Sequence, residues 1–452
     1  MEKFDALIVG AGTAGCLAAK TMAEAGLRVC LVERKKREEV GEKICGDALG
    51  EHHLKFLGLA KPQSGELEKR IDGIRIFSPD QNTVFTIAHE DFVGYLLNRR
   101  LFGQWLLNKA LDKGATILDS TLCLEPLVEK GFVTGISARS ESGRIVPLKS
   151  KVVVDASGFM GVVRHKLPKE MGIEREVANE DVEACYREIR QLKQETENSK
   201  YCEIYLNQKA SPGGYVWIFP KGGAKVNAGL GICMRGKWPN PKNQFYEQVL
   251  TKPIFEGSLL LSGGAWWDPT RRPIDKMVGN GVVLVGDAAC LVNPIHGGGI
   301  GPSMLSGFFA GQTIAEALEK GEPSEEALWS YSKKYMETYG KKQASLDIFR
   351  MLLLSSSDAD LNYGMNCKLL TEDDVLKAGM GDEFHLNITE TTKRVFRGLR
   401  RIRFLNRLRL TVSMMRTLKG HYDSYPSTPA NFEPWRIQTE ALIHQAQDKI
   451  IE

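Results

Sequence analysis

A glycine-rich turn close to the N-terminus constrains the fold of this chain more than any other feature. Residues 4–9 (FDALIV) form an apolar run of strand length, and Gly10-Ala11-Gly12-Thr13-Ala14-Gly15 follows directly. Small residues in a helical pattern continue to residue 25, and a second strand, LRVCLVE, ends at Glu33. A strand, a glycine turn, a helix and a strand within about 30 residues predict a βαβ unit with a parallel sheet.

The same turn has the GxGxxG spacing of dinucleotide-binding folds. Gly10 permits the tight turn, Gly12 lets the backbone approach a pyrophosphate, and Gly15 allows the helix to pack on the strand. N–H groups of the first helical turn, at Ala14, face the phosphates, and Glu33 stands about 20 residues on, where a carboxylate accepts from the adenosine ribose. A turn used only for packing is the alternative, but the flanking strands and the acid favour a bound dinucleotide.

A second segment indicates FAD rather than NAD. The apolar strand GVVLV leads into Gly286-Asp287-Ala288-Ala289, and a glycine run, Gly297-Gly298-Gly299-Ile300-Gly301, opens a helix expected from near Met304 to Gly321. The Asp287 carboxylate can accept from a ribityl hydroxyl, and backbone amides at Gly299 and Ile300 can reach the flavin edge. A buried capping aspartate with packing glycines is the alternative reading.

Composition excludes several classes of function. The 452 residues suggest two or three domains, and 60 basic against 56 acidic residues give a net charge of +4, so no bulk field indicates nucleic acid. Nine cysteines without a CxxC pair predict neither a disulfide framework nor a metal site. The N-terminus does not resemble a signal peptide and no run of 18 apolar residues occurs, so we expect a cytoplasmic protein whose membrane contact, if any, is peripheral and on the inner face.

These motifs together resemble a known superfamily. The glycine turn with Glu33, Asp155-Ala-Ser-Gly158 with Arg164, and the Asp287 segment are similar to the FAD-dependent p-hydroxybenzoate hydroxylase superfamily, to about residue 320. Two further segments, KICGDA at 43–48 and GGYVWIFPK at 213–221, resemble the geranylgeranyl reductase family, above all its archaeal members that reduce digeranylgeranylglycerophospholipids.

The resemblance implies an α/β fold with three parts. A Rossmann-like FAD-binding domain would comprise residues 1–75, 95–165 and 275–325, an antiparallel-sheet substrate domain residues 76–94 and 166–274, and a helical region residues 326–452. The implied activity is FAD-dependent hydrogenation of the geranylgeranyl C=C bonds of archaeal ether lipids. A flavin monooxygenase or halogenase, a geranylgeranyl diphosphate reductase and a non-catalytic lipid carrier remain alternatives.

The resemblance also implies further cofactor contacts. Cys45, Gly46 and Ala48 would touch FAD, and Cys45 is a candidate catalytic residue, either as a proton donor or as a space-filling thiol. Arg99, better aligned than Arg100, would face the pyrophosphate from the start of a helix. Cys123 would pack over the adenine through its backbone.

Three alternating aromatic residues form a candidate substrate wall. Tyr215, Trp217 and Phe219 point to one face of a strand, because strand side chains alternate. They are either an ordinary core stripe or the wall of a lipid site that ends at Pro220 beside the flavin.

The remaining partners are less constrained. No second GxGxxG follows a strand, so the electron donor would dock transiently, as NAD(P)H, a reduced deazaflavin or a ferredoxin-like protein. Residues 391–420 hold ten basic and no acidic residues, with an apolar stripe at Val395, Leu399, Ile402, Leu405, Leu408, Val412 and Met415. This amphipathic pattern predicts a helix that docks on the body, caps the lipid cavity or lies on an anionic membrane.

Overall fold

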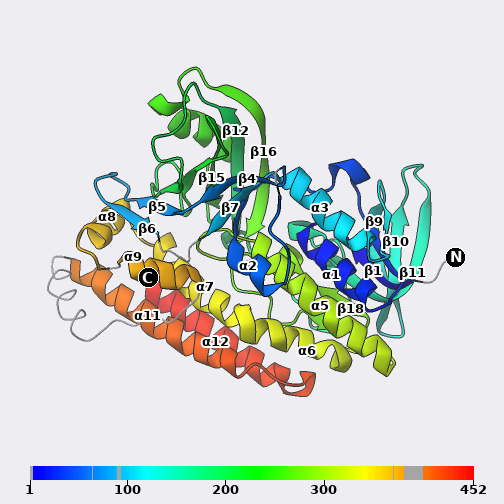
Figure 1. The fold of residues 1–452 in the computed structure, drawn as a ribbon. Coiled ribbons are helices and arrows are strands. Elements are labelled where there is room, and N and C mark those ends of the chain that lie inside the picture. The colour runs from blue at the N-terminus through cyan, green and yellow to red at the C-terminus, as the bar shows by residue number, and fades with distance from the viewer. Residues whose placement is uncertain (1–3, 64, 89–92, 370, 381–400, 452) are drawn as a thin grey trace.

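The computed structural model describes residues 4–63, 65–88, 93–369, 371–380 and 401–451. Figure 1 shows a mixed sheet with helices against it, a second sheet above, and a layer of helices from the C-terminal part of the chain below. The two sheets are built from segments far apart in the sequence, so the chain passes between them repeatedly.

The first sheet contains the predicted βαβ unit. Its central strands are β1 (Phe4–Val9), β2 (Val29–Val32), β8 (Thr116–Leu118), β11 (Ile145–Asp155) and β18 (Val282–Leu284), and neighbours among them pair in parallel. Antiparallel strands β9 (Leu122–Glu129), β10 (Phe132–Arg139) and β17 (Val278–Gly279) extend it. Helix α1 (Thr13–Glu24) links β1 to β2 and packs on α3 (Arg99–Leu111) and α5 (Ile300–Lys320). These crossovers bring the predicted cofactor residues to the carboxyl ends of the parallel strands.

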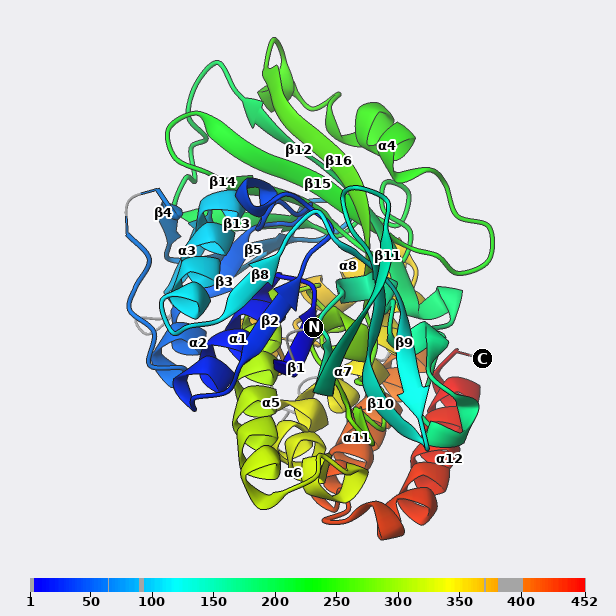
Figure 2. The same cartoon turned by 90° about the vertical axis from the view of Figure 1, so that its right-hand side faces the viewer.

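The second sheet lies above the first in Figure 2 and is almost wholly antiparallel. Its strand order is β16 (Leu259–Pro269), β12 (Val182–Gln191), β15 (Lys225–Cys233), β14 (Val216–Pro220), β13 (Tyr201–Tyr205), β5 (Gly73–Phe77) and β6 (Val84–Ile87). Only β13 and β5 pair in parallel. A separate small sheet has the strand order β3 (Ala48–Gly50), β7 (Gly94–Leu97) and β4 (Leu67–Ile71).

Helices form the rest of the molecule. Besides the short α2 (Glu51–Phe56) and α4 (Pro241–Gln244), they are α6 (Glu325–Tyr335), α7 (Lys341–Leu354), α8 (Asp358–Asn366), α9 (Glu372–Met380), α11 (Ile402–Asp423) and α12 (Phe432–Ile451). Helix α5 begins at Ile300, one turn before the predicted start near Met304, with Gly299 as its N-cap.

Within the described residues, the basic amphipathic stretch forms helix α11 from Ile402 onward. Val395 and Leu399 lie outside the described residues. In α11, Leu405, Leu408, Val412 and Met415 are buried and the helix packs on α7 and α12, whereas Ile402, the first residue of the helix, is exposed. The apolar stripe therefore docks on the body of the protein.

The α/β fold class with an antiparallel sheet and C-terminal helices is confirmed. The residue boundaries of the three domains remain a prediction. No helix within the described ranges is long and apolar enough to cross a membrane.

Candidate active site

One cavity of about 1690 Å³ extends from the glycine turn after β1 to the C-terminal helices. Both large sheets contribute to its walls, as do α7, α8, α9 and α11. Ligand pockets commonly enclose about 300–1,000 Å³, so this cavity has room for a large cofactor and a second long ligand.

The cofactor end begins at the glycine turn. Gly10 has φ +104°, and a Cβ there would lie 2.4 Å from the carbonyl oxygen of Ala156. Gly10, Gly12 and Ala14 line the cavity, and no side chain caps the start of α1, which leaves N–H groups for a phosphate. Gly15 does not line the cavity, and a Cβ there would lie 2.0 Å from the Gly10 carbonyl oxygen. It acts by allowing the helix to pack on the turn.

Glu33, the acidic residue predicted to bind the ribose, also faces the cavity. Glu33 follows β2, and its carboxylate accepts from the N–H of Ala11 (2.8 Å) and of Lys35 (3.0 Å). Cys123, on β9, lines the same end of the cavity. Glu33 therefore stabilises the glycine turn directly.

Arg99 carries a strong indication that an anion belongs here. It opens α3 behind the N-cap Asn98 and lines the cavity, as predicted. Its Nε and Nη1 atoms are buried and have no hydrogen-bond partner among the described residues. Because a buried charge without a partner is costly, these atoms fit an anionic group such as the pyrophosphate of FAD.

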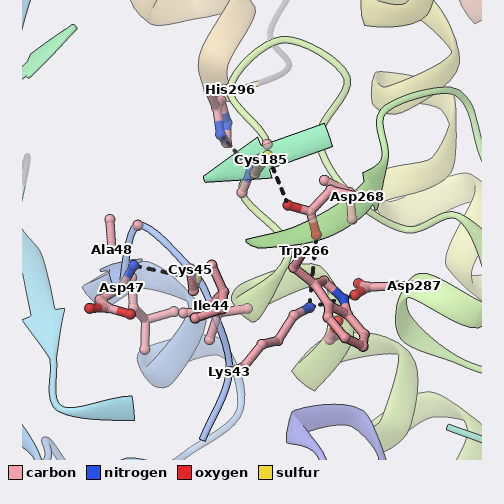
Figure 3. Close-up of a pocket in the computed structure, with 18 of the residues that line it drawn as sticks. Lys43, Ile44, Cys45, Asp47, Ala48, Cys185, Trp266, Asp268, Asp287 and His296 are labelled. Atoms are coloured by element: carbon pink, nitrogen blue, oxygen red, sulfur yellow. Dashed lines mark hydrogen bonds and ion pairs between the residues drawn. The ribbon is translucent and has the colours of Figure 1, made fainter. Parts of the chain in front are cut away.

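Asp287 and the glycine loop form the other side of the cofactor end. Asp287 is almost fully buried in the short turn Gly286–Ala289, and it lines the cavity with Gly299 and Ile300. Its Oδ2 accepts from Nζ of Lys43 at 2.7 Å, and Lys43 lies 3.9 Å from Asp268 on β16 (Figure 3). Lys43 thus ties the segment of residues 43–48, here called the Cys45 loop, to the Asp287 turn and to the second sheet.

The Cys45 loop forms part of the cavity wall. Cys45, Gly46 and Ala48 all line the cavity. Burial raises the pKa of the Cys45 thiol, with Arg99 and Lys43 opposing the shift, so the thiol keeps its proton at neutral pH. A half-buried, protonated thiol is chemically able to donate a proton to a neighbour.

The aromatic stripe lines the cavity, whereas Pro220 does not. Tyr215, Trp217 and Phe219 lie in one row, with successive ring centroids 6.1 and 6.4 Å apart. Alternation along β14 turns Pro220 to the opposite face, where Val216 and Ile218 belong to a separate core. The expectation that Pro220 lines the site is therefore wrong, and the next residue on the cavity face is Lys221.

An apolar arm continues from the aromatic wall. Trp217 and Phe219 pack with the side chains of Ile71, Cys202 and Ile204. Further lining residues come from β5, β6 and β13 on one side and from helices α7, α8, α9 and α11 on the other: Ile74, Ile76, Phe85, Ile87, Leu206, Phe349, Leu352, Leu353, Leu361, Met365, Leu376 and Phe404. This arm suits a long hydrocarbon chain. It also places the start of α11 at the cavity wall.

A polar row on β12 was missed from the sequence. Glu183 and Cys185 line the cavity, and Glu183 pairs across the sheet with Asp268. The Cys185 thiol lies 3.8 Å from Oδ2 of Asp268 (Figure 3). Burial and then the charge of Asp268 raise the pKa of Glu183 to about 8. In the sequence, the alternation of VEACYREIRQ is equally typical of a strand whose polar side chains face solvent.

Asp155 and Arg164 are structural. The Asp155 carboxylate is buried and accepts from the N–H groups of Val163 (3.1 Å) and Arg164 (2.8 Å). Arg164 in turn donates to the carbonyl oxygen of Ala288 at 2.9 Å. The pair holds the turn after β11 against the Asp287 turn.

Comparison with known proteins relates this site to reductases. Residues 5–217 match the model of FAD dependent oxidoreductases, and residues 181–264 match the geranylgeranyl reductase catalytic domain. The digeranylgeranylglycerophospholipid reductase of Sulfolobus acidocaldarius is 39% identical, over 98% of this chain and 97% of its own length. The chain belongs to the digeranylgeranylglycerophospholipid reductase family.

Other relatives agree with this membership. The digeranylgeranylglycerophospholipid reductase of Methanothrix thermoacetophila is 34% identical, over 80% of this chain and 90% of its own length. A geranylgeranyl bacteriochlorophyll reductase-like structure from Thermoplasma acidophilum superposes with a TM-score of 0.77 at 24% identity, covering 91% of this chain and all of that one, which shows that the two chains share a fold. The flavin-dependent brominase Bmp2 has a TM-score of 0.64 at 20% identity, over 84% of this chain and 94% of that one, which shows a shared fold alone. The chain is thus an FAD-dependent oxidoreductase of the reductase family.

Proposed function

We propose that this protein hydrogenates the isolated C=C bonds of geranylgeranyl chains in archaeal ether phospholipids, as a digeranylgeranylglycerophospholipid reductase of membrane lipid biosynthesis. The observation that carries the proposal is the continuity of the cavity, which joins a dinucleotide site to an apolar arm lined by β5, β6, β13 and the C-terminal helices. A polar substrate would leave that arm unused, whereas a prenyl chain fills it.

FAD is held by residues from three segments of the chain. Gly10, Gly12 and Ala14 offer backbone at the pyrophosphate, Glu33 offers its carboxylate to the ribose, and Arg99 neutralises the phosphate charge. Residues of the Cys45 loop and of the second glycine loop complete the contact set: Cys45, Gly46, Ala48, Cys123, Asp287, Gly299 and Ile300. Reduced FAD, when bound, supplies a hydride.

The aromatic wall and the apolar arm orient the lipid. Tyr215, Trp217 and Phe219 give the prenyl chain a rigid face, and the hydroxyl of Tyr215 donates to the carbonyl oxygen of His296 at 2.7 Å, which ties the wall to the second glycine loop. An isolated alkene has no carbonyl to polarise it, so its reduction depends on close alignment in a dry site.

Cys45 supplies the proton that balances the reaction. One hydride and one proton add across each double bond, and the resulting thiolate regains its proton from solvent. Cys45 lines the cavity and its thiol holds a proton at neutral pH, which supports this role.

The electrons reach the site from a transient donor: NAD(P)H, a reduced deazaflavin or a ferredoxin-like protein. The absence of a second strand-linked GxGxxG in the sequence favours transient docking over a built-in nicotinamide domain. The protein works in the cytoplasm and meets its lipid peripherally, at the inner face of the membrane.

Anaerobic flavin spectroscopy tests the proposal. The enzyme is reduced with one equivalent of dithionite and mixed with digeranylgeranylglyceryl phosphate, while the absorption of oxidised flavin is followed. We expect this absorption to return without oxygen, and not to return with a fully saturated lipid of the same head group. Reoxidation only in the presence of oxygen would instead favour a monooxygenase.

A further inference from the structure

A buried hydrogen-bond network joins the aromatic wall to the Cys45 loop. Its centre is Asn227 on β15, which has no exposed surface. The Asn227 Oδ1 atom accepts from Nε1 of Trp217 at 2.9 Å. Its Nδ2 atom donates to the carbonyl oxygen of Cys45 at 2.8 Å and to Oδ2 of Asp47 at 2.9 Å.

The chemistry of the partners fixes the orientation of this amide. An indole N–H only donates, whereas a carbonyl oxygen and an ionised carboxylate only accept. Only one orientation of Asn227 therefore satisfies Trp217, Cys45 and Asp47 together. No apolar residue of the same size can do so, and its presence would leave buried partners unsatisfied.

Asp47 links this network to the thiol itself. Its backbone N–H donates to Sγ of Cys45 at 3.3 Å, so the two residues form one turn (Figure 3). Asp47 has φ +66°, a left-handed conformation that a residue other than glycine keeps only when its surroundings hold it. The bonds from Asn227 and from Nζ of Lys221 (2.7 Å) to the Asp47 carboxylate are what hold it.

We infer that Asn227 is a positioning residue that holds the Cys45 thiol and the Trp217 ring in a fixed relation. A prenyl chain lying on the aromatic wall then meets the thiol at a set distance. The effect on turnover rests on the proposed function, in which Cys45 donates the proton. The effect on the thiol does not depend on it.

The test uses the FAD-loaded enzyme with Asn227→Leu, which keeps the size of the side chain and removes all three bonds. Alkylation of Cys45 by iodoacetamide is followed by peptide mass spectrometry, alongside flavin absorption and steady-state kinetics. We expect alkylation of Cys45 to quicken by about threefold or more, because a freed turn gives water access to a thiol whose pKa burial had raised. We expect kcat to fall about tenfold while KM for the lipid stays within about twofold, since misplacement affects the reaction more than binding.

Internal and matched controls separate positioning from general loosening. Cys185 lines the same cavity but lies outside the Cys45 turn, so its alkylation should keep the parental rate. Asn280 does not line the cavity, and its Oδ1 accepts from the N–H of Glu325 at 2.8 Å. Asn280→Leu therefore removes a comparable amide and should leave the alkylation of both thiols and kcat unchanged.

A second variant keeps the inference testable if Asn227→Leu does not fold. Trp217→Phe retains an aromatic ring on the wall and removes the five-membered ring with its indole N–H, so it should quicken alkylation of Cys45 in the same direction and by less. Unchanged alkylation of Cys45 in the folded variants, or an equal rise at Cys185, would overturn the inference. Failure of the proposed function would show separately, as parental enzyme that leaves the lipid unreduced.

Discussion

At the scale of single residues, Arg99 is the side chain whose surroundings most directly call for a ligand. Replacement by alanine removes a charge-assisted contact worth about 1.5–3 kcal/mol, so we expect the Kd of FAD to rise between about tenfold and about a hundredfold. Quenching of flavin fluorescence on binding to apoprotein measures this. Arg100→Ala is the matched control, because the Arg100 guanidinium is exposed and bonds to the carbonyl oxygen of Glu38 at 3.0 Å. Equal losses in both variants would argue against a phosphate contact for Arg99.

Cys45 carries the second prediction at this scale. If its thiol donates the proton, Cys45→Ala should lower kcat about a hundredfold, because general acid catalysis contributes roughly that much. Cys367→Ala provides the control, since Cys367 is a half-buried thiol that does not line the cavity. Turnover of Cys45→Ala at the parental rate, with FAD bound, would show that the proton comes from elsewhere.

Glu183 makes the stability of the protein depend on pH. Burial and the charge of Asp268 raise its pKa from 4.5 to about 8, with Arg350 opposing. The folded protein thus holds a proton that the unfolded chain has lost, and the stabilisation is complete below the unfolded pKa and disappears as the pH rises through the folded one. We expect Glu183→Gln to lose less unfolding free energy between about pH 5 and about pH 9, by on the order of 2 kcal/mol. Urea unfolding at the two pH values measures the difference, and identical pH dependence would contradict it.

At the scale of elements, local periodicity predicted most of what was found. The βαβ unit and the shared face of Tyr215, Trp217 and Phe219 follow from spacing, whereas the helix that Arg99 opens is implied by the family resemblance. The same alternation excludes Pro220 from that face. The cavity-facing residues of β12 could not be predicted in this way, because polar residues that face a cavity and polar residues that face solvent have the same period.

The environment of the apolar stripe on helix α11 could be found only from the structure. Its amphipathic stripe is equally suited to a membrane and to the body of a protein, and the structure buries it against α7. We expect Val412→Asp to cost more than about 3 kcal/mol in unfolding free energy, because it buries an unpaired charge. Ser413→Asp, one residue along on the exposed face, should change the stability by less than about 0.5 kcal/mol. Thermal unfolding of both variants measures this, and equal stability would show that the stripe is not buried.

At the scale of the whole molecule, the site depends on contacts that no local pattern reveals. Lys43 meets Asp287 across 244 positions of sequence, and Asn227 meets Cys45 across 182. The motifs predicted which segments form the cofactor end of the cavity. The joining of that end to an apolar arm depends on how the second sheet and the C-terminal helices pack, and therefore required the structure.

Mass spectrometry of the lipid product tests the proposed activity most directly. Enzyme reduced anaerobically is incubated with digeranylgeranylglyceryl phosphate in D₂O, and the mass of the recovered lipid is measured by mass spectrometry. We predict that the lipid mass rises stepwise by one hydrogen pair per double bond. One member of each pair should be deuterium, which D₂O supplies through the enzyme in place of the proton. Lipid recovered with its mass unchanged, from enzyme that holds both reduced FAD and lipid, would contradict a reductase and leave a carrier or an oxygen-dependent enzyme.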